Sequence, residues 1–258
     1  MTYSRFIALG DSFTEGMVDE VVKGQYRGWA DRVADVMAQN NPGFTYANLA
    51  IRGKKIGQVL DEQIPVALGY ITGPETLVSF YAGVNDALRP GYEPLKAFKD
   101  YQRAAKALAE SGATLILFCV LEDVGVKFPL MRQWKERFSA FNENVRKVAG
   151  QVGAILLDPN GEPTWSHPGF VDKDRLHLSV SGHYRVAQGV LARLDLPHDP
   201  YWRAPLADYQ RPPFFTRLKS NVNWFITYAI PWFIRRIRGR SSGDGRSAKY
   251  PAPINWNS

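Results

Sequence analysis

Four short segments, in a fixed order along the chain, contain residue types that can together perform nucleophilic catalysis. They are Gly10-Asp11-Ser12, Gly53, Gly83-Val84-Asn85-Asp86 and Asp174-Arg175-Leu176-His177. A serine hydroxyl is a weak nucleophile at neutral pH, so it needs a base within hydrogen-bond reach, and the base needs an acceptor that orients it. Ser12, His177 and Asp174 are the candidates for these three roles.

The same segments offer hydrogen-bond donors for the oxyanion that forms when a hydroxyl adds to a carbonyl carbon. Gly10 lets the chain turn sharply, which would place the Ser12 amide at the start of a helix, where N–H groups are free. Gly53 adds an amide that no side chain covers, and the Asn85 carboxamide adds a third donor. We therefore expect Ser12, Gly53 and Asn85 to form an oxyanion hole.

The elements that would position these residues alternate between short apolar runs and longer amphipathic stretches. We expect strands over 5–9, 44–49, 76–81, 114–120 and 154–157, and helices over 29–37, 56–67, 94–110, 132–149 and 181–194. Such alternation with apolar strands is typical of a parallel sheet covered by helices on both faces. The candidate residues follow the first, second, third and fifth strands, so all are predicted at the rim formed by the strands' carboxyl ends.

Each segment alone has an ordinary structural explanation. Gly-Asp-Ser is a common turn sequence, the segment 83–86 could end a strand with an Asx-turn, and the pair Asp174 and His177 could be half of a metal site or a surface pair. Their order, with each segment beyond a strand's carboxyl end, favours a catalytic site instead.

As a set, the segments resemble the SGNH hydrolases, also called the GDSL esterase and lipase family. The residues that give the family its name match Ser12, Gly53, Asn85 and His177, and Phe13 replaces the leucine of the nucleophile block. The resemblance covers about residues 3–195. It implies a flavodoxin-like three-layer α/β/α fold with a five-stranded parallel sheet. It also implies a serine esterase that hydrolyses lipid, acetyl-sugar or small acyl esters through an acyl-serine.

Two other functions are compatible with the same residues. An acyltransferase could use the site with an acceptor other than water. A non-catalytic protein that binds a membrane surface or a partner could keep the hydrolase fold. The intact set of candidate residues argues against the non-catalytic protein, since a site without catalytic function could lose any of these residues.

Other polar residues near these segments have weaker claims. We expect His183 to be a packed or capping histidine, Asp86 to cap the next turn, and Arg52 either to contact substrate or to pair with a carboxylate. The single cysteine, Cys119, lies in an apolar run and is expected to be buried. No Cys/His cluster has zinc spacing, so we predict no metal site and no cofactor.

The net charge of +7 comes from the end of the chain. Residues 1–197 hold 22 Lys+Arg and 22 Asp+Glu, whereas residues 198–258 hold 10 and 3. We therefore divide the chain into a catalytic domain, 1–197, and a basic, aromatic-rich extension, 198–258. No signal peptide and no apolar run of about 18 residues is visible, so a cytoplasmic location is expected, either free or peripheral to a membrane.

The extension contains an aromatic-rich stretch, 222–234, followed by Arg235, Arg236, Arg238 and Arg240. A helix that packs on the catalytic domain, kinked or divided at Pro231, is the favoured explanation. An anchor at an anionic membrane surface is the second. A nucleic-acid patch is the third, and we predict no nucleic-acid partner because no RNA or DNA module is recognisable. Residues from Ser241 onward are expected to be flexible.

Overall fold

Five of the six strands in the central sheet lie parallel, and the sixth runs antiparallel at one edge. The structure, a computed structural model, describes residues 2–39, 41–122, 131–207 and 212–256. The strand order is β7-β6-β5-β1-β4-β8. The strands are β1 (Arg5–Gly10), β4 (Thr45–Asn48), β5 (Thr76–Tyr81), β6 (Thr114–Phe118), β7 (Ile155–Leu157) and β8 (Tyr250–Asn255). A short hairpin, β2 (Val21–Val22) and β3 (Gln25–Tyr26), stands apart from this sheet.

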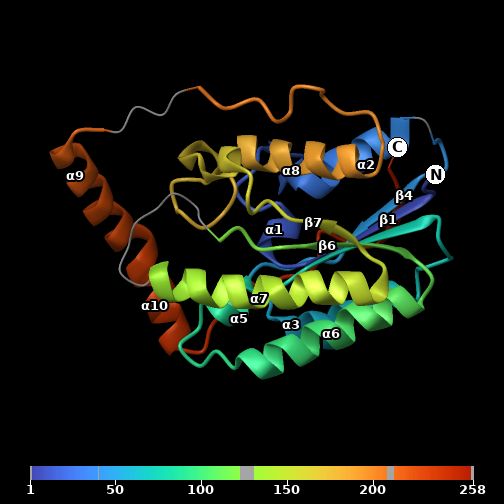
Figure 1. Ribbon diagram of the computed structural model, residues 1–258, viewed down its shortest axis with the longest axis horizontal. Coiled ribbons are helices and arrows are strands. Elements are labelled where there is room, and N and C mark those ends of the chain that lie inside the picture. The colour runs from blue at the N-terminus through green and yellow to red at the C-terminus, as the bar shows by residue number, and fades with distance from the viewer. Residues whose placement is uncertain (1, 40, 123–130, 208–211, 257–258) are drawn as a thin grey trace.

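Helices cover both faces of the sheet, so the molecule has the three-layer α/β/α architecture predicted from the sequence (Figure 1). One layer contains α2 (Gly28–Gln39) and α8 (Val180–Arg193), which pack together. The other contains α3 (Ile56–Gln58), α6 (Pro94–Glu110) and α7 (Met131–Val152), with α6 in contact with both of the others. Short helices α1 (Ser12–Glu15) and α5 (Val84–Ala87) follow β1 and β5, and the 3-10 turns η2 (Pro163–Ser166) and η3 (Pro168–Phe170) precede α8.

The strands form where the sequence is apolar without interruption, because both faces of this sheet are buried. All six residues of β5 are buried, as are five of the six in β1. The helices contribute apolar residues at helical spacing: α2 buries Trp29, Val33 and Met37, and α6 buries Tyr101, Ala105 and Leu108. Cys119 is buried, as expected.

The sheet has six strands rather than the predicted five, and the expectation of a flexible end from Ser241 onward is wrong for residues 250–255. These residues form β8, which pairs with β4. Tyr250 and the following Trp256 pack their rings against Tyr46 of β4. The segment contains two prolines, which remove backbone donors, and an edge strand tolerates this because only one of its sides is paired. The division of the chain at residue 197 stays a prediction.

The extension also forms one long interrupted helix. It consists of α9 (Phe214–Trp224), a π-helical turn η4 (Phe225–Ala229) and α10 (Ile230–Ile237). A second π turn, η1 (Val59–Gln63), precedes α4 (Ile64–Leu68). Both π turns end just before an Ile-Pro pair, Ile64-Pro65 and Ile230-Pro231. Proline removes one backbone donor and its ring crowds the residue four positions earlier, and the wider turn provides space for it.

No helix of the described residues is both long enough and apolar enough to pass through a bilayer.

Candidate active site

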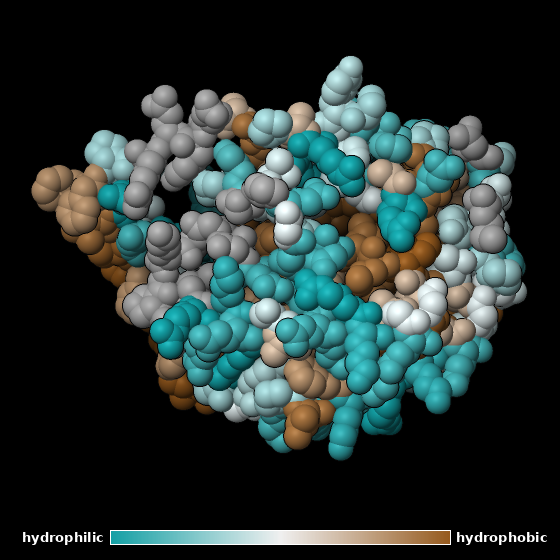
Figure 2. All heavy atoms as spheres, viewed as in Figure 1, coloured by the Kyte–Doolittle hydropathy of each residue, from teal (hydrophilic) through white to brown (hydrophobic). Residues whose placement is uncertain are grey.

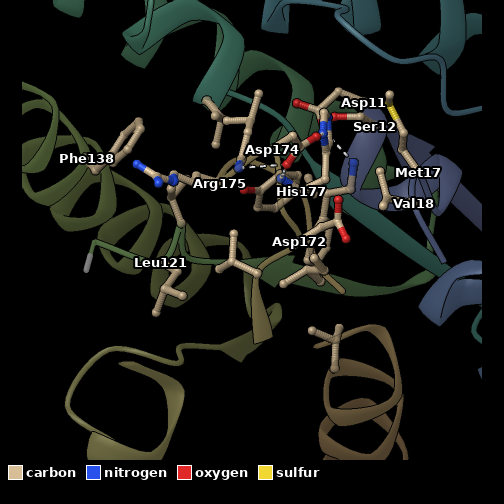
Figure 3. A pocket seen from close by; sticks show the side chains of 18 of the residues that line it. Asp11, Ser12, Met17, Val18, Leu121, Phe138, Asp172, Asp174, Arg175 and His177 are labelled. Carbon is tan, nitrogen blue, oxygen red and sulfur yellow. Dashed lines mark hydrogen bonds and ion pairs between the residues drawn. The ribbon is translucent and has the colours of Figure 1, made fainter. Parts of the chain in front are cut away.

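A cavity of about 1460 Å³ lies beyond the carboxyl ends of the parallel strands, and the extension forms part of its wall. Its lining includes residues that follow β1, β5, β6 and β7. All of the candidate catalytic residues line it: Ser12, Gly53, Asn85, Asp174 and His177. Figure 3 shows Asp11, Ser12, Asp174 and His177 close together in this cavity. The structure therefore brings together residues that the sequence spreads over more than half of the chain.

Asp174 and His177 form a hydrogen-bonded pair, with 2.5 Å between Asp174 Oδ2 and His177 Nδ1. Asp174 Oδ1 accepts the backbone N–H groups of Leu176 and His177 at 3.0 Å each. Burial would raise the pKa of Asp174, but the hydrogen bonds and charge of His177 outweigh it and lower the pKa below its usual value. An ionised Asp174 fixes the ring of His177 with Nδ1–H as the donor, which leaves Nε2 available as a base.

Ser12 is placed by a tightly held turn at the end of β1. Gly10 has a φ of +144°, and a Cβ there would lie 2.2 Å from the carbonyl oxygen of Tyr81. The buried Gln63 side chain holds both backbone groups of Gly10, at 2.8 Å and 2.9 Å. Asp11 caps α1 by accepting the N–H of Phe13 at 3.1 Å. Ser12 is then the first residue of α1, so its amide has no partner within the helix.

The Asn85 carboxamide is oriented by Asp11, the residue next to Ser12. Asn85 Nδ2 donates to Asp11 Oδ2 at 2.9 Å, which leaves the second hydrogen of Nδ2 for another acceptor. Burial raises the pKa of Asp11 to about 7, against the lowering effect of its hydrogen bonds from Phe13 and Asn85 and of the charge of His177. Gly83, before α5, has a φ of +123°, and a Cβ there would lie 2.5 Å from the Phe141 ring.

An ion pair joins α1, the helix that begins with Ser12, to the Gly53 loop. Glu15 of α1 accepts the Arg52 backbone N–H at 2.6 Å and its Nε at 2.9 Å. Arg52 therefore pairs with a carboxylate. Both partners are largely buried, so the pair fixes the distance between two of the segments expected to donate to an oxyanion. Glu15 was missed, although it lies within the segment 8–16 that resembles the family's nucleophile block.

Asp86 and His183 each form a hydrogen bond with the backbone of another segment of the fold. Asp86 was expected to cap the next turn, but its Oδ2 accepts the N–H of Ile56 in α3, at 3.0 Å. Burial raises the pKa of Asp86 to about 6. His183 is fully buried in α8, and its Nε2 lies 3.0 Å from the carbonyl oxygen of Met17. Burial lowers the pKa of His183 to about 4, so it is a neutral, packed histidine at neutral pH, as expected.

The extension contacts the catalytic segments at two places that the sequence did not indicate. Trp224 Nε1 donates to the carbonyl oxygen of Asp174 at 2.8 Å. Arg175 lies over the Trp224 ring at 4.8 Å and donates to Asn221 Oδ1 at 2.8 Å. Helix α9 thus holds the loop that presents Asp174 and His177. No local signal could have predicted these contacts, because they join residues 46 and 50 positions apart.

The second place is the Gly53 loop. A Cβ on residue 53, where φ is +77°, would lie 2.1 Å from Ser241 Oγ, and one on residue 243 would lie 2.0 Å from the Arg52 carbonyl oxygen. Gly53 is thus needed for close approach of the extension as well as for its backbone conformation. Ser242 lines the cavity. Within the described part of the chain, no group of three or more His, Cys, Asp or Glu is arranged to hold a metal ion.

The fold and the cavity define a class of protein: an α/β/α hydrolase with its polar residues at the carboxyl ends of parallel strands. Residues 8–185 match the model of the GDSL-like lipase/acylhydrolase family. The chain belongs to this family, as its motifs predicted, and is an enzyme that hydrolyses ester bonds. A comparison with curated protein sequences finds no match.

Solved structures share the fold at low sequence identity. An acetylxylan esterase, Axe2, from Geobacillus stearothermophilus is 17% identical over 74% of this chain and 94% of its own, with a TM-score of 0.56. A psychrotrophic esterase, EstA, from Pseudoalteromonas sp. is 16% identical over 74% of this chain and 97% of its own, with a TM-score of 0.57. TesA is 21% identical over 74% and 97%, with a TM-score of 0.55.

Proposed function

We propose that this protein is a serine esterase that cleaves carboxylic esters through an acyl-enzyme on Ser12. The observation that carries the proposal is the convergence of Ser12, Gly53, Asn85 and the hydrogen-bonded Asp174–His177 pair on one cavity. This set provides a nucleophile, a base, an orienting carboxylate and oxyanion donors in one place.

In the first half of the reaction, Ser12 Oγ attacks the ester carbonyl carbon while His177 Nε2 takes the hydroxyl proton. The resulting oxyanion accepts hydrogen bonds from the amides of Ser12 and Gly53 and from the free hydrogen of Asn85 Nδ2. The C–O bond to the alcohol then breaks, and His177 gives its proton to the departing alkoxide oxygen. Asp174 stays ionised and stabilises the imidazolium during both transfers.

In the second half, a water molecule attacks the acyl-serine carbonyl carbon and His177 takes one of its protons. The oxyanion forms again in the same donor set. When the bond to Ser12 Oγ breaks, the serine recovers its proton from His177 and the carboxylic acid leaves.

A kinetic comparison tests this function. Hydrolysis of p-nitrophenyl esters from acetyl to palmitoyl is measured for the wild type and for Ser12→Ala. We expect the substitution to lower kcat by more than about a thousandfold, because the acyl-enzyme can no longer form, without a change in the melting temperature. A Ser12→Ala enzyme whose kcat stays above about one thousandth of the wild-type value would contradict the assignment.

A further inference from the structure

The interrupted helix over 214–237 is apolar on two opposite sides. Trp224, Tyr228 and Trp232 are spaced by four residues and all line the cavity. Trp224 bonds the catalytic loop, and Trp232 packs against the hydrophobic core. These three residues form the inner face. The packing of this face on the catalytic domain agrees with the interpretation favoured from the sequence.

The opposite side of the same helix is also apolar, and it is exposed. Its residues recur at intervals of three or four and therefore share one side of the helix. We call them the outer face: Phe215, Leu218, Val222, Ile226, Ile230, Phe233 and Ile237. Among the described residues, 11 of the 21 exposed large hydrophobic side chains lie between 214 and 237. The seven of these on the outer face form one patch rather than the scattered exposure that is normal for a protein surface. Figure 2 shows apolar side chains gathered at the left edge, over α9 and α10.

The positive charge of this region favours an anionic lipid surface over a second copy of the chain as the partner of the outer face. From residue 209 to residue 243 the sequence has seven Lys or Arg and no Asp or Glu. A second copy of the chain docked on the same face would bring two such regions together, and like charges would repel. An anionic lipid surface instead offers hydrocarbon for the apolar side chains and phosphates for the basic ones.

The mouth of the cavity is continuous with this surface. Phe225, Phe233, Ile234 and Arg235 line the cavity, and the three apolar residues among them are also well exposed. An acyl chain that leaves a lipid layer beside α10 would thus meet apolar side chains along its path to Ser12. The cavity is larger than an acetyl or other small acyl group requires, since pockets for drug-sized molecules occupy about 300–1,000 Å³.

We propose that the outer face docks in the interfacial region of an anionic membrane, and that the enzyme takes amphiphilic, long-chain esters from that surface. The substrate part of this proposal rests on the esterase function proposed above, whereas the docking part does not. The helix lies along the surface, because its inner face stays on the catalytic domain while its outer face contacts lipid.

Vesicle binding tests the docking part in a protein that cannot turn over substrate. The full-length Ser12→Ala protein is centrifuged with phosphatidylcholine vesicles prepared with or without phosphatidylglycerol. We expect binding to the phosphatidylglycerol vesicles, weakened by salt, and much less binding to phosphatidylcholine alone. Replacing Phe215, Leu218 and Ile226 together by Gln should reduce binding at least tenfold. These residues are 79%, 48% and 59% exposed and lie outside the cavity lining.

A matched control carries three Gln substitutions elsewhere on the surface. Val21, Val66 and Leu95 are 63%, 42% and 74% exposed, and none of them lines the cavity. The control protein should bind vesicles as the parent does. Equal binding by the two triple variants, or no binding by the parent, would overturn the docking proposal. A parent that is dimeric in solution and fails to bind vesicles, with a monomeric outer-face variant, would assign the face to self-association instead.

Turnover in an otherwise wild-type background tests the substrate part. The outer-face variant should hydrolyse p-nitrophenyl acetate at the wild-type rate and a long-chain ester embedded in vesicles at least tenfold more slowly. Equal loss on both substrates would contradict delivery from the surface. Vesicle binding without hydrolysis of any ester would contradict the esterase function and support the docking proposal. Ester hydrolysis without vesicle binding would support the esterase function and contradict the docking proposal.

Discussion

At the scale of single residues, Asn85 Nδ2 carries two hydrogens, and we propose a separate task for each. One bonds Asp11, the buried neighbour of Ser12, and the other would bond the oxyanion in the proposed reaction. This arrangement orients the carboxamide before substrate arrives, so little reorganisation is needed during the reaction. Asp11 thus orients the Asn85 carboxamide and caps α1.

Replacing Asn85 by Ala should therefore slow the chemical step. We expect kcat to fall by about a hundredfold to a thousandfold, or about 2.7–4 kcal/mol in activation free energy, with little change in KM. Steady-state kinetics on a soluble p-nitrophenyl ester measures both constants. An effect on KM alone would instead make Asn85 a substrate-binding group.

At the scale of elements, helix α9 supports the loop of Asp174 and His177 through an indole hydrogen bond, beside the bond from Arg175 to Asn221. The bond from Trp224 Nε1 holds the carbonyl oxygen of Asp174, while the ring packs under Arg175. Trp224→Phe removes the donor and keeps an aromatic ring. We expect kcat to fall by about fivefold, because one hydrogen bond of about 1 kcal/mol no longer orders the loop.

The matched control for Trp224→Phe is Trp256→Phe. Trp256 Nε1 donates to Asp35 Oδ1 at 2.8 Å, beside the edge strand and away from the cavity. The two substitutions remove the same chemical group, so both should lower the melting temperature slightly. Only the change at Trp224 should lower kcat. A similar loss of kcat in both variants would show that the effect is general destabilisation.

The last part of the chain is held by a buried cation. Lys249 Nζ donates to Asp31 Oδ2 at 2.9 Å and to the carbonyl oxygens of Tyr26 and Arg27, at 2.8 and 3.0 Å. Burial raises the pKa of Asp31 to about 6, although Lys249 lowers it. Each partner therefore compensates for the burial of the other.

Lys249→Met should leave the Asp31 carboxylate buried without its cation. We expect the free energy of unfolding at neutral pH to fall by about 3 kcal/mol, measured by urea denaturation. The double variant Lys249→Met, Asp31→Asn should lose less, since no buried charge remains. If the double variant were as unstable as the single one, the ion pair would not be the source of the stability.

The elements that the sequence predicts are those set by local pattern. The five parallel strands and the helices over the sheet follow from apolar runs and helical spacing. The motif segments indicate the candidate site residues, which line one cavity because each segment follows a strand. Strand β8 was missed because Pro251 and Pro253 are unfavourable in a strand unless it lies at an edge. The contacts of Trp224 and Lys249 join distant parts of the chain, so no local pattern could indicate them.

At the scale of the whole molecule, the extension passes from one end of the sheet to the other. After α8 it crosses to the cavity, forms the helix that contacts the catalytic loop, passes the Gly53 loop and ends in β8 (Figure 1). Two of the segments that hold candidate site residues, the Asp174–His177 loop and the Gly53 loop, therefore contact residues beyond 197. Deleting the extension would remove these contacts together with an edge strand.

The pH dependence of stability should contain a contribution from buried His183. In the unfolded chain this histidine takes up a proton below about pH 6.5, whereas in the folded protein it does so only near pH 4. Between these values the unfolded state binds more protons, so this residue makes stability fall as pH falls. Above about pH 6.5 and below about pH 4, the contribution of His183 to the free energy of unfolding does not change with pH.

Replacing His183 by Gln removes this proton uptake. We expect the free energy of unfolding of the variant to fall less than that of the wild type between pH 6.5 and 5, by about 1–2 kcal/mol. Urea denaturation at both pH values measures the difference. Asp11, Asp31 and Asp86, whose pKa values are raised, act in the opposite sense in this range but equally in both proteins. Identical pH slopes would show that His183 is not buried in its neutral form.

The central claim is that Ser12 is the activated nucleophile, and labelling with a fluorophosphonate followed by peptide mass spectrometry tests it most directly. The reagent phosphonylates a serine whose hydroxyl is activated by a base and whose oxyanion is stabilised. We predict one adduct per chain, on Ser12, absent from Ser12→Ala and much slower to form in His177→Ala. An unlabelled wild-type protein, or an adduct on any other residue, would contradict the account.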